Sequence, residues 1–454
     1  MIATYTLIGL ILALAQFVPV HSFDLEDRDD TLKASKSLAS SLISFYHGNE
    51  SGQTPGLLPE VTIDDNEAGE ASGYYWLQSG AFMSAYIDYW HLTGDDTYND
   101  LVAQGIQWQV GENHDFMPAN RTATIANDEQ SIWALGALTA AEYDFPASSG
   151  EQPRWLDLAI AVWETQRERW DLEVENGSCD GGLRWGIVPT FDGYDYISGF
   201  SNSLFFNLGA RLARFTGNET FAGYAENTWD WLEANELLDT ASWVVYDGRY
   251  ANMNCTENSK ALMSASPASL IMGAAFMYNL TDGAREWKDR TEQLTAATVK
   301  LFFPKNKGFV EVACIQDYCG RDQLTYKAFA HRWLAVTTQV APFTSDLILP
   351  ALQRSAEMSK ERNKVDDDAL EQTLGNFAAV SNLLIAGSAS PRTQNLTTED
   401  GVNKTEDGAI SSSSSSSSPA STEEADEENC SARFVDVASL MATYLLMFLS
   451  LWIH

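Results

Sequence analysis

The stretch ATIANDEQSIWALGALTAAE, residues 123–142, consists of two contrasting halves. The first half is polar and places two adjacent carboxylates, Asp128 and Glu129, directly after Asn127, a residue type that favours helix N-caps. The second half is apolar nearly all round and rich in small residues, which is typical of a helix buried on every side. The stretch therefore predicts a buried helix over 128–143 that begins beside two acids.

Helical periodicity continues through most of the chain from Asp24 to about Gly387, with almost no alternating strand pattern. This periodicity predicts a series of helices separated by turns and loops. The twelve predicted helices are 31–46, 74–93, 97–108, 128–143, 154–171, 201–216, 219–235, 266–280, 284–303, 321–341, 346–360 and 368–386.

The predicted helices alternate in character along the chain. Even-numbered helices are apolar nearly all round, as in SNSLFFNLGARLARF (201–215), whereas odd-numbered helices carry a charged face, as in REWKDRTEQLTAATVKLF (285–302). Short turns follow the even helices and longer loops mostly follow the odd ones, so the long loops should emerge at one end. Six buried helices ringed by six exposed ones make an all-α fold, an (α/α)6 barrel. Its inner helices should begin at the long-loop end, where sites are usually found.

The two ends of the chain predict secretion and a lipid anchor. The apolar run Tyr5–Val20 has the length of a signal-peptide core, with cleavage after Ser22. The apolar run Leu440–Ile453 follows small residues and a spacer, a pattern that favours a glycosylphosphatidylinositol (GPI) signal over a tail anchor or a single-pass helix. We expect the lipid at Asn429 and no other link to the membrane. The predicted parts are a signal peptide at 1–22, the helical domain at 23–390, a stalk at 391–431 and a removed anchor signal at 432–454.

The stalk and the sequons fit a place at the cell surface. The serine run 411–418 and the acidic cluster that follows it cannot bury a core, which predicts a disordered and O-glycosylated spacer. Potential N-glycosylation sites point to the same compartment. These are Asn49, Asn120, Asn176, Asn218, Asn254, Asn279, Asn395 and Asn403.

The chain has 5 cysteines, of which Cys430 would leave with the anchor signal. The remaining four allow three pairings. We favour one small loop closed by Cys314 and Cys319, together with a bond between Cys179 and Cys255. No cysteine or histidine spacing suggests zinc, so no metal or cofactor is expected.

The formal net charge of -35 argues against nucleic acid or an anionic membrane surface as a partner. It suits a neutral or cationic substrate, or simply keeps the protein soluble. The chain also has 14 Trp and 17 Tyr, whose rings can stack on sugars, although core packing accounts for most such rings.

Asp128 and Glu129 allow two interpretations. Acids in a first helical turn commonly complement the partial positive charge there. Two neighbouring carboxyls can also act as the nucleophile and the general acid that cleave a glycosidic bond. The buried helix, the long-loop end and the secreted character of the chain favour the second interpretation.

Most of the helical region resembles the fungal cell-wall endo-α-1,6-mannanases of glycoside hydrolase family 76, in particular their GPI-anchored branch. The resemblance implies an (α/α)6 barrel, a retaining mechanism and a mannan or GPI-linked glycan as substrate, in a cell-wall role. The matching stretches are 74–111, NDEQSIWALGALTAAE (127–142), GGLRW (181–185), 201–218, 273–281, ACIQDYCGRDQLTYKAF (313–329) and 331–342.

The resemblance also assigns the catalytic pair. The family has two adjacent aspartates in an NDDQ motif, the first as nucleophile and the second as acid/base. The motif here reads NDEQ, so Asp128 matches the nucleophile, and Glu129 replaces the acid/base with one more methylene. Water as acceptor gives hydrolysis, and a hydroxyl of a wall glucan gives transfer. Expected substrate-binding residues are Asn127, Gln130, Trp76, Trp133, Trp185 and Asn202, with core packing as the alternative for each Trp.

Two features keep a second function class open. A glycan-binding or scaffold protein without catalytic activity could retain the cleft, and NDEQ in place of NDDQ is compatible with that. The segment KALMSASPA (260–268) also differs from the QWSYN-like segment of the family. Arg184 in GGLRW could bind a sugar hydroxyl or pair with an acid, and we favour pairing.

Overall fold

The computed structural model describes residues 23–60, 73–147, 152–314, 319–362 and 369–394. The predicted signal peptide, nearly all of the predicted stalk, and the anchor signal with Asn429 lie outside these ranges. Within the part of the chain that is described, no helix has the length and apolar character needed to cross a membrane.

The described residues form twelve α-helices, and each coincides with one of the predicted segments to within a few residues. Short 3-10 helices at Ala251–Met253, Pro342–Thr344 and Asn382–Gly387 accompany them. The helices are α1 (Arg28–Ile43), α2 (Trp76–Thr93), α3 (Asn99–Trp108), α4 (Asn127–Tyr143), α5 (Trp155–Asn176), α6 (Gly199–Thr216), α7 (Glu219–Ala234), α8 (Ala265–Leu280), α9 (Arg285–Phe302), α10 (Arg321–Val340), α11 (Ser345–Arg362) and α12 (Leu370–Ser381).

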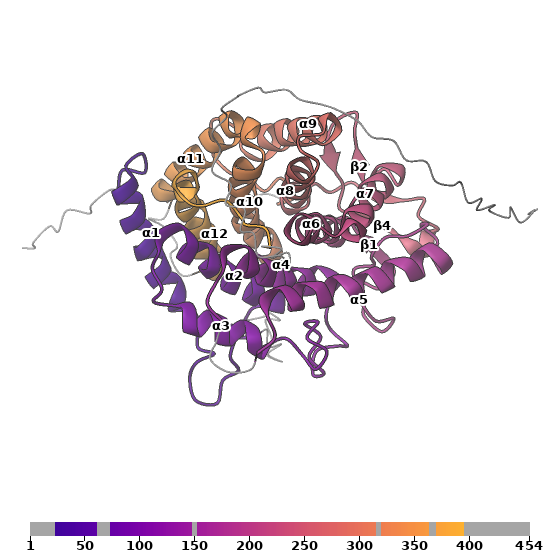
Figure 1. Ribbon diagram of the computed structural model, residues 1–454, viewed down its shortest axis with the longest axis horizontal. Helices are drawn as coiled ribbons and strands as arrows, with labels where there is room; N and C mark the ends of the chain where they lie inside the picture. Colours follow the sequence, from indigo (N-terminus) through magenta and orange to yellow (C-terminus); the bar gives the residue numbers. More distant parts are fainter. Residues whose placement is uncertain (1–22, 61–72, 148–151, 315–318, 363–368, 395–454) are drawn as a thin grey trace, which may run out of the picture. The chain divides into compact units, whose positions relative to one another are not determined.

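The even-numbered helices form a closed inner ring. Each packs against the next in the order α2, α4, α6, α8, α10, α12, and α12 returns to α2. The odd-numbered helices lie outside this ring, and each contacts an inner helix that adjoins it in the chain (Figure 1). Helix α1 contacts α2 in the same way but packs chiefly on α12. This arrangement is the predicted (α/α)6 barrel.

Small residues let the inner helices approach one another closely. Every residue of α8 from Ala265 to Met277 is buried. A Cβ atom on Gly273 would lie 2.5 Å from the ring of Phe206 on α6, and one on Gly136 would lie 2.3 Å from the hydroxyl oxygen of Ser84 on α2. Interiors this densely packed do not absorb an added methyl group without rearrangement. The small residues of the even helices therefore set the spacing of the ring.

The turns place all inner-helix N-termini at one end of the barrel. Inner helices α2 and α6 end at Gly94 and Gly217, which adopt the left-handed conformation with φ of 74° and 71°. Such C-caps stop a helix abruptly and allow the short turn to the next outer helix. The long loops then connect outer helices to inner ones at the opposite end, as the sequence predicted.

Short strands in the long loops were not predicted. Strand β1 (Tyr196–Ser198) pairs antiparallel with β4 (Gly248–Tyr250), which also pairs with β5 (Asn258–Ser259). A second ladder joins β2 (Leu238–Asp239) and β3 (Val244–Val245). Strands of two or three residues are too short for an alternating pattern to reveal them in the sequence.

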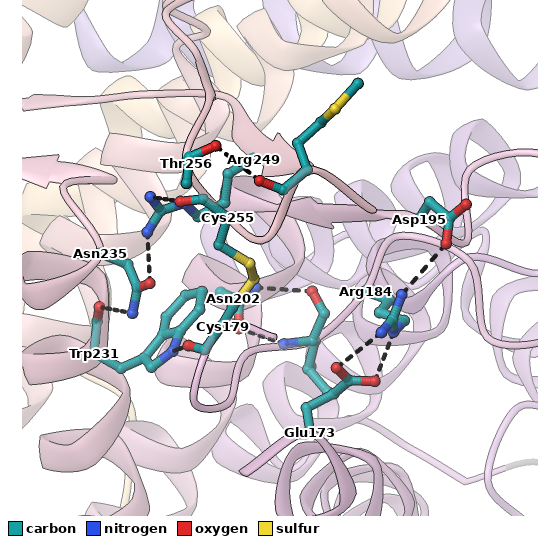
Figure 2. The surroundings of a disulfide bond; sticks show 12 residues. Glu173, Cys179, Arg184, Asp195, Asn202, Trp231, Asn235, Arg249, Cys255 and Thr256 are labelled. Atoms are coloured by element: carbon teal, nitrogen blue, oxygen red, sulfur yellow. Dashed lines mark hydrogen bonds and ion pairs between the residues drawn. A yellow bond between two sulfur atoms is a disulfide. The ribbon is translucent and has the colours of Figure 1, made fainter. Parts of the chain in front are cut away.

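Both disulfides have the predicted pairing. Cys314 and Cys319 close a small loop before α10. Cys179 and Cys255 join the loop after α5 to the segment between β4 and β5 (Figure 2). The Trp231 indole N–H donates to the Cys179 carbonyl oxygen at 2.9 Å, which holds this bond against α7.

The other end of the barrel is closed by a buried ion pair and by the last described residues. Arg211 on α6 and Glu142 on α4 are each 1% exposed and lie 2.6 Å apart. The Arg392 N–H donates to the Glu142 carbonyl, and the Gln394 N–H donates to the Phe215 carbonyl at 2.8 Å. Residues 391–394 therefore belong with the barrel, four residues beyond the predicted end of the domain at 390.

Arg211→Met tests the closure of the ring at this end. The substitution leaves the Glu142 carboxylate buried without its partner, so we expect the free energy of unfolding to fall by about 3–5 kcal/mol. Denaturant unfolding followed by circular dichroism measures this change. Arg285→Met is the matched control, because its side chain is 92% exposed in a surface pair and should contribute almost nothing. Equal stabilities of the two variants would contradict the assigned role of Arg211.

Candidate active site

A cavity of about 420 Å³ lies at the long-loop end of the barrel. Its floor includes Asp128, Phe200 and Asp322, which come from the first turns of inner helices α4, α6 and α10. Its walls come from the long loops and from strands β1 and β4. The full lining is Asp128, Trp185, Asp192, Gly193, Tyr196, Ser198, Phe200, Asp247, Tyr250, Met263, Asp322, Gln323 and Tyr326.

The start of α4 differs by one residue from the prediction. Its N-cap is Ala126, so Asn127 is the first residue of the helix and not its cap. Glu129, three residues after the cap, returns to it: its Oε2 accepts the Ala126 N–H at 3.1 Å. Its Oε1 accepts the Leu77 N–H of α2 at 3.3 Å. The capping side chain is therefore Glu129 and not Gln130, because Asn127 and Gln130 are bonded elsewhere.

Asp128 is buried, with 7% of its surface exposed, and lines the cavity. One carboxylate oxygen accepts the Glu129 N–H at 2.8 Å. Burial raises the pKa of the Asp128 carboxyl well above its ordinary value, and the charges of Glu129 and Asp322 raise it further. Hydrogen bonds from the Glu129 N–H and the Trp185 side chain act in the opposite direction. Burial and the neighbouring charges outweigh these bonds, so Asp128 holds a proton more tightly than an exposed aspartate.

Glu129 is partly exposed and lines a separate, smaller hollow of about 250 Å³, whose lining also includes Trp76 and Arg121. Burial raises the pKa of the Glu129 carboxyl to about 7, and the charge of Asp322 adds to this effect. The two N–H donors and the Arg121 charge lower the pKa but do not offset burial. A carboxyl that titrates near neutrality suits a general acid/base.

Two expected substrate-binding residues hold a loop instead. Asn127 and Asn202 are 1% and 0% exposed. The Asn127 amide donates to the Arg184 carbonyl at 2.8 Å. The Asn202 amide oxygen accepts the Leu183 N–H at 2.8 Å, and its NH2 group donates to the Leu183 carbonyl (Figure 2). Both side chains thus bond the GGLRW backbone, which positions Trp185, and the buried amide oxygen of Asn127 has no hydrogen-bond partner among the described residues.

The aromatic and amide candidates divide between cavity and core. Trp185 is 38% exposed and lines the cavity, as expected. Trp133 is 1% exposed and packs between the rings of Trp76 and Phe116, so it is a core residue with no surface for a sugar. Gln130 is fully buried and donates to the Asp115 carbonyl at 2.7 Å, so it too anchors a loop.

Trp76 is buried, with its indole N–H bonded to the Gln109 side chain at 3.0 Å, and only its edge reaches the smaller hollow. Arg184 is paired with an acid, as favoured from the sequence. Its guanidinium donates to both carboxylate oxygens of Glu173, at 2.6 and 3.1 Å (Figure 2). Neither residue is free to bind a sugar in the larger cavity.

Sequence reasoning missed most of the acidic lining. Four carboxylates face the cavity, and its described lining contains no Lys or Arg. The sequence could have identified Asp322 as a candidate site residue, because Asp322 and Gln323 open an inner helix just as the acid and amide of NDEQ do. Asp192 and Asp247 come from irregular loops, and no sequence pattern identifies them as site residues. Met263, from the divergent KALMSASPA segment, also lines the cavity.

The sequence profile of glycosyl hydrolase family 76 matches residues 30–392. The chain belongs to this family. The family 76 chain is 35% identical over 353 residues to "Mannan endo-1,6-alpha-mannosidase DCW1" of Saccharomyces cerevisiae, covering 77% of this chain and 74% of the relative. It is 34% identical over 351 residues to "Mannan endo-1,6-alpha-mannosidase DFG5" of the same species, covering 76% of this chain and 72% of the relative.

Solved structures place the family 76 chain in the same fold. The crystal structure of Dfg5 from Chaetomium thermophilum in complex with glucosamine aligns with a TM-score of 0.75 at 40% identity, over 82% of this chain and 94% of that one. An inactive α-1,6-mannanase variant from Salegentibacter in complex with α-1,6-mannotriose aligns with a TM-score of 0.60 at 12% identity, over 78% and 99%. The second likeness concerns the fold alone. The chain is thus a glycoside hydrolase with an (α/α)6 barrel.

Asp128→Asn tests the burial of charge in this glycoside hydrolase. The pKa of the Asp128 carboxyl is higher in the folded than in the unfolded chain, so the protonated form favours folding. This contribution to the free energy of unfolding is lost as the pH rises through the folded-state pKa. Asparagine removes the charge and keeps an oxygen that can accept the Glu129 N–H. We expect the variant to exceed the wild type in free energy of unfolding by an amount that grows as the pH rises above about 4, the ordinary pKa of an aspartate.

Denaturant unfolding across this pH range measures the difference. Asp346→Asn is the control, because Asp346 is an exposed acid in the first turn of outer helix α11. Identical pH dependence of the free energy of unfolding in the wild type and Asp128→Asn would show that folding does not raise the pKa of Asp128.

Proposed function

We propose that this glycoside hydrolase cleaves or transfers α-1,6-linked mannan, or the mannose-containing glycan of GPI-linked wall proteins, with retention of configuration. One observation carries the proposal. Adjacent carboxylates open an inner helix, Asp128 on the floor of a sugar-sized cavity and Glu129 beside it with a pKa of about 7. A retaining glycosidase needs such a close pair flanking the scissile bond.

The first step forms a bond between Asp128 and the sugar. The ionised Asp128 carboxylate attacks the anomeric carbon of a mannose bound in the cavity, and the glycosidic C–O bond breaks. Glu129 gives its proton to the departing oxygen, which leaves toward the hollow that Glu129 lines. When the attack begins, Asp128 must be ionised and Glu129 must be protonated, so the two carboxyls together carry one proton.

The second step releases the sugar. Glu129, now ionised, takes a proton from an incoming hydroxyl as that oxygen attacks the anomeric carbon and the bond to Asp128 breaks. A water molecule gives hydrolysis, and a hydroxyl of a wall glucan gives transglycosylation.

The charge of the cavity fits the proposed substrates. Its lining has four acids and no basic residue, and the whole chain has a formal net charge of -35. Both disfavour an anionic sugar and favour a neutral one such as mannose, or one that carries an amine. The glucosamine bound by the Chaetomium relative is of the second kind. A GPI-linked glycan combines both types of sugar.

The proposed location is the outer face of the plasma membrane, or the cell wall, after secretion. The GPI anchor at Asn429 remains a proposal from the sequence. Every sequon asparagine within the described ranges is exposed, as N-glycosylation requires. These are Asn49, Asn120, Asn176, Asn218, Asn254 and Asn279.

Incubation of the purified protein with an α-1,6-mannan tests the reaction itself. We expect new reducing ends, or transfer products when a glucan oligosaccharide is present. Asp128→Asn should lower kcat/KM at least about 10³-fold, because the amide cannot act as a nucleophile. Asp346→Asn should retain wild-type activity. Binding of the mannan without turnover, equal in the wild type and Asp128→Asn, would favour a glycan-binding scaffold instead.

The pH profile of kcat/KM tests the assignment of the acid. Glu129 must be protonated to act first, and its pKa is raised to about 7, so activity should be present below pH 7 and lost as the pH rises above it. On the acid side, activity should fall as Asp128 takes up its proton. On a substrate with a good leaving group, which reacts without acid assistance, Glu129→Gln should retain activity and lose the alkaline limb. An alkaline limb that Glu129→Gln leaves in place would assign the acid to another residue.

A further inference from the structure

Asp322 lines the same cavity as Asp128 but comes from α10, which does not adjoin α4 in the inner ring. Its charge raises the pKa of Asp128 and of Glu129, so it lies within electrostatic reach of both. The mechanism proposed above gives it no task. Its position across the mouth of the barrel from the catalytic pair calls for an explanation.

A buried glutamine holds Asp322 in place. Gln78 on α2 is 0% exposed, and its NH2 group donates to Asp322 Oδ1 at 2.8 Å and to the Thr325 hydroxyl at 3.3 Å. The Gln78 amide oxygen accepts the Tyr75 N–H at 3.0 Å. All of the polar groups of Gln78 are therefore in use. Gln78, whose side chain is held by these three hydrogen bonds, therefore fixes the orientation of one oxygen of Asp322.

The second oxygen of Asp322 is available to a ligand. Among the described residues, no hydrogen bond engages Asp322 Oδ2, and no ion pair includes Asp322. The neighbouring cation, Arg321, is instead paired with Glu371 at 2.8 Å. Asp322 is partly buried with a single hydrogen bond and no countercharge, which is costly for a carboxylate, and such costs concentrate at functional sites.

A capping role does not account for Asp322. The N-cap of α10 is Gly320, and none of the backbone N–H groups in the first turn of α10 is bonded to the Asp322 side chain in the described structure. The charged and titratable groups around it are Asp128, Glu129, Arg321, Tyr326 and Glu371. Most of these are acids or bear no charge, so the surroundings do not stabilise a negative Asp322 either.

We propose that Asp322 is a third functional carboxylate of the site, whose free oxygen accepts a hydrogen bond from a hydroxyl of the sugar held over Asp128. This inference rests on the proposed function, because it assigns a contact within the same sugar-binding cavity. Its negative charge has a second effect. It disfavours ionisation of both Asp128 and Glu129, and so it keeps the acid proton on the pair to a higher pH.

Asp322→Asn tests the role of Asp322. Asparagine keeps an oxygen that can accept the Gln78 amide proton, so the fold should survive, but it removes the charge. We expect kcat/KM on an α-1,6-mannan oligosaccharide to fall about 10- to 100-fold, the usual effect of losing a hydrogen bond to a charged group. Both limbs of the pH profile should move to lower pH, because the negative charge that raised the two pKa values is gone.

Gln78→Ala separates the orientation of Asp322 from its charge. This variant frees the carboxylate to move but leaves its charge in the cavity. We expect a smaller fall in kcat/KM and pH limbs that stay where they are in the wild type. Asp346→Asn, an exposed acid on α11, serves as the control that changes neither.

The outcomes separate this inference from the proposed function. If the wild type turns over mannan and Asp322→Asn keeps kcat/KM within about twofold with unmoved pH limbs, the inference is overturned and the proposed function stands. If the wild type turns over no mannan, the proposed function fails. Calorimetric titration with the same oligosaccharide then decides the contact: binding about tenfold weaker in Asp322→Asn supports it, and equal binding overturns it.

Discussion

The site depends on one constraint of the barrel: all six inner helices begin at the same end. The first turn of each helix leaves backbone N–H groups without helical partners and carries a partial positive charge. Carboxylates suit these positions, and Asp128, Glu129 and Asp322 occupy them on α4 and α10. The same end is buried beneath long loops, which opposes ionisation. For Glu129 burial prevails, because its pKa is about 7 even with two N–H donors on its carboxylate.

Buried amide side chains fix the conformation of the long loops that form the walls of the cavity. Asn127, Asn202 and Gln130 all lie on inner helices, and each bonds a loop carbonyl. The disulfide between Cys179 and Cys255 joins the two loops that contribute Trp185 and Tyr250 to the cavity. Residues that resemble substrate ligands in the sequence therefore act one step away from the cavity. They fix the side chains that face it, as a precise site requires.

The two ends of the barrel serve different purposes. At the long-loop end, four acids and no basic residue are among the described lining of the cavity, a condition that opposes stability and permits chemistry. At the other end, charges are buried in pairs, as with Arg211 and Glu142 between α6 and α4 or Arg332 and Asp88 between α10 and α2. These pairs connect inner helices that are distant in the chain. Because the buried charges at this end are paired, the ring can tolerate the unfavourable charges of the acids at the long-loop end.

The sequence by itself determined the barrel and the place of Asp128 and Glu129 at the start of an inner helix, because helical periodicity, loop lengths and motifs are local or nearly local signals. It favoured, among three possible pairings, the one that the structure shows. It also indicated that Arg184 pairs with an acid. Only the tertiary structure decided which polar residues face the cavity. Trp133 and Asn202 carry residue types that bind sugars, yet packing places one in the core and bonds the other to a loop. Asp192 and Asp247 reach the cavity through irregular loops, whose paths no local pattern encodes.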